Sequence, residues 1–91
     1  MTLATAQFEL DNLTATKIVS ASVNPQFVTL HNLTKSSNEY IYYGGANVST
    51  TNSPHIDPGD TLKLQLLPLE ELYAVSDPAD LVVGVMTQKQ N

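Results

Sequence analysis

Short runs in which apolar and polar residues alternate, each ended by proline, glycine or asparagine, are the feature of this sequence that most constrains its fold. The alternation is clearest in residues 61–67, where leucine occupies every second position and so faces one side of an extended chain. No window carries apolar residues at the i, i+3, i+4, i+7 spacing of an amphipathic helix. The pattern predicts an all-β protein of seven or eight short strands, folded as a small antiparallel β-sandwich or a partly open β-barrel.

The segments between these runs are rich in turn-forming residues. Residues 57–60 have the sequence Asp-Pro-Gly-Asp, and Pro followed by Gly is the order that a type II turn favours. Residues 68–71 begin with proline, which the first turn of a helix tolerates, so we expect a single helical turn there. Residues 46–56 are mostly polar, and we expect an exposed loop. The expected strands cover residues 5–13, 16–22, 26–33, 39–43, 61–67, 72–76 and 81–87.

Residues 26–33 form a run whose two faces are both partly apolar. The faces consist of Val28, Leu30 and Asn32 on one side, and of Phe27, Thr29, His31 and Leu33 on the other. Either both faces are partly covered within the protein, or one of them meets a partner. Tyrosines are concentrated in the next run, where Tyr40 and Tyr42 share a face and Tyr43 lies on the other. Because tyrosine favours both strands and protein interfaces, both interpretations stay open.

Length and charge limit the number of domains and the kinds of partner. The 91 residues suffice for one domain. We place it at residues 15–91, with residues 1–14 as an N-terminal arm or a first strand. Four residues are lysines, none is arginine, nine are acidic, and the net charge is −5. Nucleic acids and anionic membranes attract clustered basic residues, so neither is expected as a partner. We expect no secretion signal and no transmembrane helix, which needs roughly 20 apolar residues.

The arm-or-strand alternative concerns Phe8 and Leu10, which alternate with Glu9 and Asp11. As an arm, the segment would order on assembly and add an edge strand to a neighbouring subunit or to a partner protein, with Phe8 and Leu10 setting the register. As a first strand, it would bury the same two side chains in the sandwich. The sequence supports the two interpretations equally.

Few residues offer catalytic or metal-binding chemistry. His55, Asp57 and Asp60 lie within six residues and could ligate a metal, but there is no EF-hand spacing, and the capping of a Pro-Gly turn explains Asp57. The neighbouring carboxylates Glu70 and Glu71 diverge on a strand or a turn and would not share a proton. No Gly-x-Ser-x-Gly nucleophile elbow occurs, and the absence of cysteine excludes disulfides and thiolate zinc sites. We therefore expect no enzyme activity, no cofactor and no bound metal.

Four stretches occur in a fixed order: a V-x-L-x-N strand, a Y-x-G-G-x-x-V strand, a Pro-Gly turn with a leucine strand, and an L-Y-A strand. The stretches are residues 27–34, 40–48, 56–64 and 72–76. This order resembles the small structural proteins of tailed bacteriophages. The resemblance covers about residues 26–87 and consists of strand patterns and glycine turns.

The resemblance implies a structural virion protein, most like a capsid decoration (cement) protein that binds the major capsid protein on the outer head surface. Because cement proteins sit on three-fold positions of the capsid, the resemblance also implies a homo-oligomer, with a trimer favoured. The alternatives are a head-fibre, neck or tail component, and a virion-attached carbohydrate-binding module that uses the face of Tyr40 and Tyr42 or the loop at residues 47–54. The expected interface residues are Phe8, Leu10, Phe27, Tyr40, Tyr42 and Tyr43.

Overall fold

The computed structural model describes residues 2–34 and 36–89, and within them the chain forms eight strands and no helix. The strands are β1 (Thr2–Glu9), β2 (Thr16–Val19), β3 (Gln26–Asn32), β4 (Tyr40–Gly44), β5 (His55–Ile56), β6 (Thr61–Leu66), β7 (Leu72–Asp77) and β8 (Val82–Lys89). The predicted all-β class is confirmed. A search of the described residues for a helix long and apolar enough to cross a membrane finds none.

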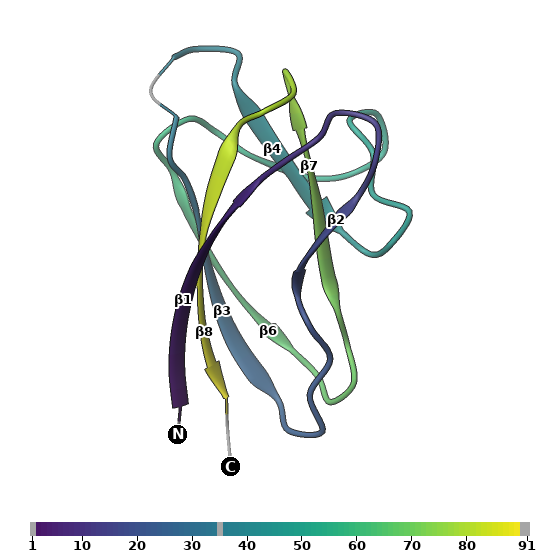
Figure 1. Ribbon diagram of the computed structural model, residues 1–91, viewed down its shortest axis with the longest axis vertical. Coiled ribbons are helices and arrows are strands. Elements are labelled where there is room, and N and C mark those ends of the chain that lie inside the picture. The colour runs from purple at the N-terminus through teal and green to yellow at the C-terminus, as the bar shows by residue number, and fades with distance from the viewer. Residues whose placement is uncertain (1, 35, 90–91) are drawn as a thin grey trace.

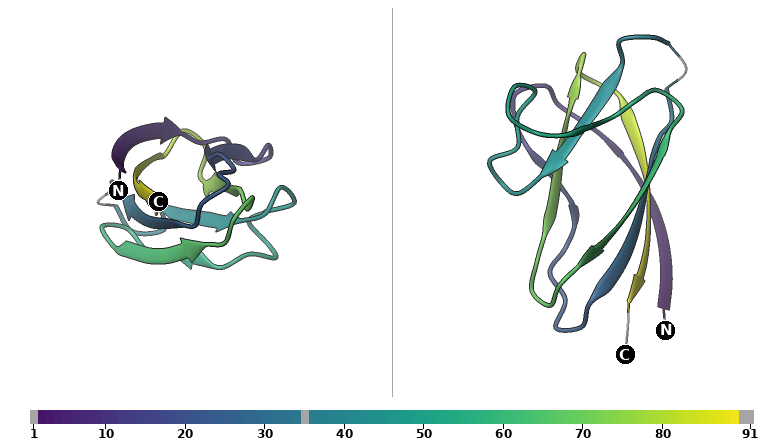
Figure 2. Two further views of the ribbon diagram at one scale, coloured as in Figure 1. Left: turned by 90° about the horizontal axis from the view of Figure 1, so that it is seen from below. Right: turned by 180° about the vertical axis from the view of Figure 1, so that it is seen from behind.

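Two antiparallel four-stranded sheets pack face to face (Figure 1). Sheet A has the strand order β1-β8-β3-β6, and sheet B has the order β2-β7-β4-β5. The pairing is nested, because β1 pairs with β8, β2 with β7, β3 with β6 and β4 with β5. A long hairpin folded over on itself in this way is a jelly-roll sandwich. Of the two predicted architectures the sandwich is therefore confirmed, and Figure 2 shows its two layers from the end and from behind.

The core lies between the sheets and consists of the inward residues of the alternating runs. In β3, Val28 and Leu30 are 1% and 0% exposed, whereas Phe27 is 42% exposed. Sheet B contributes Ile41 and Ala74, which are fully buried. The core cluster comprises Leu10, Ile18, Val19, Val28, Leu30, Ile41, Ile56, Leu66, Leu72, Ala74, Leu81, Val83 and Val85. Burial of each larger aliphatic side chain stabilises the fold by about 1.5–3 kcal/mol, so the alternation specifies which face of each strand is inside.

A buried amide ties the two sheets together. Asn32, at the end of β3, is 0% exposed. Its Nδ2 donates to the carbonyl oxygens of Glu39 and Ile56 at 2.9 and 3.0 Å, and these residues precede β4 and belong to β5 of sheet B. Its Oδ1 accepts the N–H and the hydroxyl of Thr34 at 3.1 and 2.8 Å. Because every polar group of the side chain has a partner, burial of the amide carries no unsatisfied donor or acceptor.

The turn at residues 57–60 has the predicted geometry. Gly59 has a φ of 78°, in the left-handed region that glycine adopts without steric cost and that a type II turn requires at its third position. The N–H of Asp60 donates to the carbonyl of Asp57 at 3.0 Å and closes the turn. This turn carries the chain from β5 of sheet B to β6 of sheet A.

The predicted helical turn at residues 68–71 is wrong. Leu69 has a φ of 69°, which a right-handed helix excludes. The N–H of Glu70 donates to the carbonyl of Leu67 at 3.1 Å, and the Glu70 carboxylate accepts the N–H of Leu67 at 2.6 Å. The segment has to reverse the chain between β6 of one sheet and β7 of the other within a few residues, and a tight turn does this where a helix would not.

Residues 2–9 form β1, which lies at the edge of sheet A and pairs with β8 along its whole length. Leu10 follows the strand and is 1% exposed, and its N–H donates to the carbonyl of Leu81 at 2.9 Å. Phe8 is half-buried against the core. In this structure the N-terminal segment is therefore an edge strand of the sandwich, and no described strand lies beyond it.

Candidate functional site

The outer face of sheet A carries three of the seven large apolar side chains that are exposed in the described part of the chain. Phe27, Leu33 and Met86 are 42%, 39% and 41% exposed on this face. The strand register places the following residues on it: Thr5, Gln7 and Glu9 of β1; Val82, Gly84 and Met86 of β8; Phe27, Thr29 and His31 of β3; and Thr61, Lys63 and Gln65 of β6. Apolar groups collected on one face of a small protein are a candidate contact surface for another protein.

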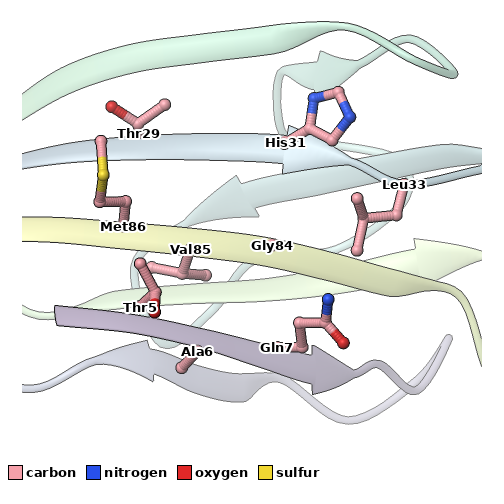
Figure 3. A pocket seen from close by; sticks show the side chains of 9 residues that line it. All are labelled: Thr5, Ala6, Gln7, Thr29, His31, Leu33, Gly84, Val85 and Met86. Atoms are coloured by element: carbon pink, nitrogen blue, oxygen red, sulfur yellow. The ribbon is translucent and has the colours of Figure 1, made fainter.

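A shallow groove of about 550 Å³ lies over Gly84 at the centre of this face (Figure 3). One wall consists of Thr29 and His31 of β3 and of Leu33, which follows that strand. The other wall consists of Thr5 and Gln7 of β1, and Met86 lies at one end. Because Gly84 has no side chain, the backbone of β8 forms the floor of the groove. A group from outside can therefore approach this backbone closely.

The fold itself does not require glycine at position 84. A Cβ atom there would lie 3.7 Å from Cδ1 of Leu33 and 3.8 Å from Cβ of His31, which are ordinary van der Waals distances. The φ of Gly84 is not in the left-handed region, in contrast to that of Gly59. Glycine inside a strand costs roughly 0.5–1 kcal/mol relative to alanine. A strand glycine without a structural reason is typical of a place that another molecule approaches closely.

The groove is lined without formal charge. Its described lining contains no Asp, Glu, Lys or Arg, and Nδ1 of His31 lies 2.9 Å from the hydroxyl of Thr61, within hydrogen-bonding distance. Lys63 lies on β6 directly opposite Thr29, beside the groove. This arrangement can bind apolar groups of a partner and attract a nearby carboxylate.

The outer face of sheet B has a different character, because aromatic and charged side chains on it contact one another. The ring of His55 lies 4.8 Å from that of Tyr40 in an edge-to-face arrangement and 5.5 Å from that of Tyr42. Nε2 of His55 lies 3.0 Å from Oδ1 of Asp57. Val75, which pairs with Tyr42 in the register, is 0% exposed, so the chain itself covers this part of the face.

The residues considered for a metal do not form a ligand set in the structure. The carboxylate of Asp57 contacts His55, whereas the backbone carbonyl of Asp57, not its side chain, accepts the bond that closes the turn. Asp60 lines a small hollow of about 220 Å³ beside these two residues. Within residues 2–34 and 36–89 no group of three or more His, Asp or Glu side chains is placed to hold a metal ion.

An exposed ion pair joins the start of β2 to the link before β7. Nζ of Lys17 lies 2.8 Å from Oε2 of Glu71. The hydrogen bond from Lys17 holds the pKa of the Glu71 carboxyl below its ordinary value, and the same bond raises the pKa of Lys17. Tyr73 adds to this group, since its hydroxyl donates to Oε1 of Glu71 at 3.3 Å. The ion pair connects two neighbouring segments of sheet B and involves no residue of sheet A.

The six residues predicted for a protein interface lie in three different places. Leu10 is in the core, and Phe8 and Tyr43 are half-buried against it, so the structure commits these three side chains to the protein interior. Tyr40 and Tyr42 are partly exposed on the outer face of sheet B. Phe27 is on the outer face of sheet A.

Sequence reasoning placed Thr29, His31 and Leu33 on the face of Phe27 but missed the residues that β8 adds to it. Gly84 and Met86 belong to β8, and Leu33 meets Gly84 only because β8 pairs with β3. The period-2 spacing of positions 82, 84 and 86 was a local signal that they share a face. The partner of that face depends on strand order, which no local pattern contains.

Comparisons with known proteins bear on the fold. No protein-family model matches the sequence, and no curated protein matches it significantly. Among solved structures, the chain is similar to a protein of the Bacillus endospore appendages, which form disulfide-linked pili, with a TM-score of 0.61 and 9% sequence identity. The match covers 99% of this chain and 87% of that chain, and it supports the β-sandwich fold. This chain has no cysteine, so it cannot form such a disulfide link.

Proposed function

We propose that this chain is a structural protein of a bacteriophage particle, most like a capsid decoration protein that binds the major capsid protein on the outer head surface. The observation that carries the proposal is the outer face of sheet A, where Phe27, Leu33 and Met86 are open to solvent around a groove. Contiguous apolar groups on a small protein are typical of binding surfaces. The order of strand motifs within residues 26–87 supports the same class of protein through its resemblance to phage structural proteins.

In this proposal the chain supplies binding surface and no chemistry, and it needs no cofactor. It acts in many copies, as a homo-oligomer with a trimer favoured by the resemblance to cement proteins. The likeness to a pilus protein supports a role as a repeated structural unit in general. It does not favour a head over a neck, tail or head fibre, which remain alternative positions on the particle.

The test is the composition of particles from the source culture. Virions are purified on a density gradient, the copies of this chain per major capsid protein are counted by quantitative mass spectrometry, and cryo-electron microscopy maps the particle. We expect a fixed ratio of the two proteins and density for a small sandwich on the outer head surface. Absence of the chain from all particles would contradict the proposal, and density on the neck or tail would replace the head assignment with one of the alternatives.

A matched pair of variants tests the surface. Phe27→Glu places a charge on the outer face of sheet A, outside the groove, and should strongly lower occupancy, because burial of an unpaired charge in an interface is costly. Leu13→Glu changes a side chain that is 87% exposed in the link between β1 and β2 and should leave occupancy unchanged. Equal occupancy of both variants would count against the outer face of sheet A as the contact.

A second candidate function, binding of a host-surface glycan, is favoured by the aromatic face of sheet B. Tyr40 and Tyr42 flank His55, and the carboxylate of Asp57 lies beside the His55 ring. Aromatic rings give apolar contact area, and a carboxylate accepts hydrogen bonds from hydroxyl groups. Calorimetric titration with host surface polysaccharide should show binding that Tyr42→Ala abolishes and Met86→Ala preserves. A wild-type chain that releases no heat would exclude this function.

A further inference from the structure

An apolar knob lies at one end of the sandwich, away from the groove. Val23, in the link between β2 and β3, is 77% exposed, and Leu67 and Leu69, in the link between β6 and β7, are 61% and 69% exposed. The two links lie side by side at the bottom of Figure 1, and the N–H of Leu69 donates to the carbonyl of Ser22 at 2.7 Å. We call these three side chains the turn knob. None of them lines the groove over Gly84.

One residue of the turn knob, Leu69, has a backbone conformation that destabilises the turn. Leu69 has a φ of 69°, a conformation that glycine or asparagine adopts readily and that a bulky side chain adopts at a cost. Such strain persists where the surrounding structure imposes it, and it is concentrated at functional positions. The turn therefore holds an aliphatic side chain in solvent at a position where glycine would relieve the strain.

The groove and the turn knob each contain a residue whose size is not the one that the local backbone favours. Position 84 has glycine where a larger residue fits, and position 69 has leucine where glycine fits. We infer that the turn knob of one copy of this chain inserts into the Gly84 groove of a second copy. The inference rests on the proposed structural role and names the surfaces through which copies of the chain would meet. Phe27 does not line the groove and stays open on the same face for the capsid protein.

Size and charge agree with this occupant. The groove of about 550 Å³ falls in the range of clefts that enclose a small molecule, so it can hold leucine side chains. Glu70 adjoins Leu69 in the knob, and Lys63 lies beside the groove. Neither forms an ion pair with another described residue. Oε1 of Glu70 accepts the N–H of Leu67, which leaves Oε2 of one copy to meet Lys63 of the next. The groove lining and the three side chains of the turn knob contain no Asp, Glu, Lys or Arg.

The geometry of the two surfaces specifies the kind of assembly. Knob and groove share no residue and lie at the end and on the side of the sandwich, so a copy that inserts its knob keeps its own groove free. Such a heterologous contact repeats from copy to copy and produces a ring or an open row. It also allows a sharp test, because each surface can be removed separately.

The experiment uses two variants of the full chain in sedimentation velocity from micromolar to millimolar concentration. Gly84→Val fills the groove, and Leu67→Ser with Leu69→Gly removes the knob. We expect the wild type to associate with rising concentration and each variant to associate about tenfold or more weakly, the loss that truncation of an interface hot spot causes. Leu13→Ser, an equally apolar and more exposed position at the opposite end, is the matched control and should associate like the wild type.

A mixture of the two variants tests whether it is the turn knob and the groove that bind each other. The knob variant retains a groove and the groove variant retains a knob, so an equimolar mixture should form a one-to-one dimer that grows no further. Melting temperatures of each variant, measured in parallel, establish that both are folded. A wild type that stays monomeric, or a mixture that forms no dimer, overturns the inference. Because the experiment needs only the purified chain, either result is independent of whether the chain is found on phage particles.

Discussion

The outer faces of the two sheets differ in how far their own side chains cover them. On sheet B, His55 contacts Tyr40 and Tyr42, and the chain itself covers Val75 completely. On sheet A, Phe27 and Met86 remain open, and a glycine leaves a groove that nothing in the described chain fills. A face whose outward residues already contact one another gains little from a partner, so the difference directs a protein partner to sheet A.

The largest expected effect on stability comes from replacing Asn32, whose side chain hydrogen-bonds sheet A to sheet B. Asn32→Leu removes the Nδ2 donor to the carbonyls of Glu39 and Ile56. It also removes the Oδ1 acceptor of the Thr34 N–H, while the Thr34 hydroxyl keeps its longer bond of 3.4 Å to the Glu39 carbonyl. Each buried group left unpaired costs about 1–3 kcal/mol, so we expect a loss of about 3 kcal/mol. At about 4–8 °C per kcal/mol for a domain of this size, the melting temperature should fall by about 12–24 °C.

The control for this change is Asn47→Ala, at an exposed asparagine of the loop between β4 and β5. Surface substitutions of this kind stay within about 0.5 kcal/mol. Thermal unfolding followed by circular dichroism measures both variants. Equal melting temperatures for the two would mean that Asn32 does not join the sheets.

A second pair of variants tests the comparison directly. Val75→Ala removes two buried methyl groups from sheet B, and at about 0.8 kcal/mol each plus the cavity term it should cost about 2 kcal/mol. Met86→Ala shortens a side chain that is 41% exposed on sheet A and should change the stability of the isolated chain much less. Urea titration gives both free energies of unfolding. If Met86→Ala proves the more costly, the face of sheet A is not the open one.

Gly84→Ala sharpens the comparison in the opposite direction. Alanine removes the cost of glycine in a strand, and the added Cβ meets Leu33 and His31 at ordinary distances. We expect a gain of roughly 0.5–1 kcal/mol in the free energy of unfolding of the isolated chain. The same urea titration measures it, with Gly59→Ala as the contrast, because a left-handed φ makes that change destabilising. A loss of stability in Gly84→Ala would mean that the fold requires the glycine.

The smallest effect concerns the exposed pair of Lys17 and Glu71 on sheet B. The pKa of Glu71 is held below its ordinary value of 4.5, so its contribution to stability is present above that pH and is lost as the pH falls through the lowered value. Lys17 has a raised pKa, so its contribution is lost only as the pH rises above 10.5. Glu71→Gln should therefore melt slightly below the wild type at pH 7 and converge with it in acid. A gap that widens in acid would contradict the assignment.

The strand positions were predictable where alternation is strong and were missed where it is weak. Residues 26–32 and 61–66 fell within predicted strands because each contains several period-2 positions. The two-residue strand β5 lies in a polar stretch expected to be a loop, and β1 begins at Thr2, earlier than the expected position 5. β5 is a strand because it pairs with β4, and the start of β1 is a strand because it pairs with β8. The alternation of apolar and polar residues in these two segments does not predict either.

The candidate site was predictable in part. The run at residues 26–33 stood out because it is apolar on both faces, and its alternation placed Phe27, Thr29, His31 and Leu33 on one of them. Gly84 and Met86 joined this face only through the pairing of β8 with β3, and the tyrosines that composition favoured lie on the other sheet. Exposed apolar residues in turns, such as Leu69, gave no signal at all, because an isolated leucine in a loop is common.

The sequence by itself determined which side of each strand is buried, because side chains alternate along an extended chain and burial of apolar groups decides the inward set. It also determined the Pro-Gly turn at residues 57–60, where a left-handed position needs glycine. Only the tertiary structure decided which outward faces lie together. The nested pairing of first with last strand brings β1, β8 and β3 side by side, and this order depends on contacts between residues far apart in the chain. The Gly84 groove exists because of that order.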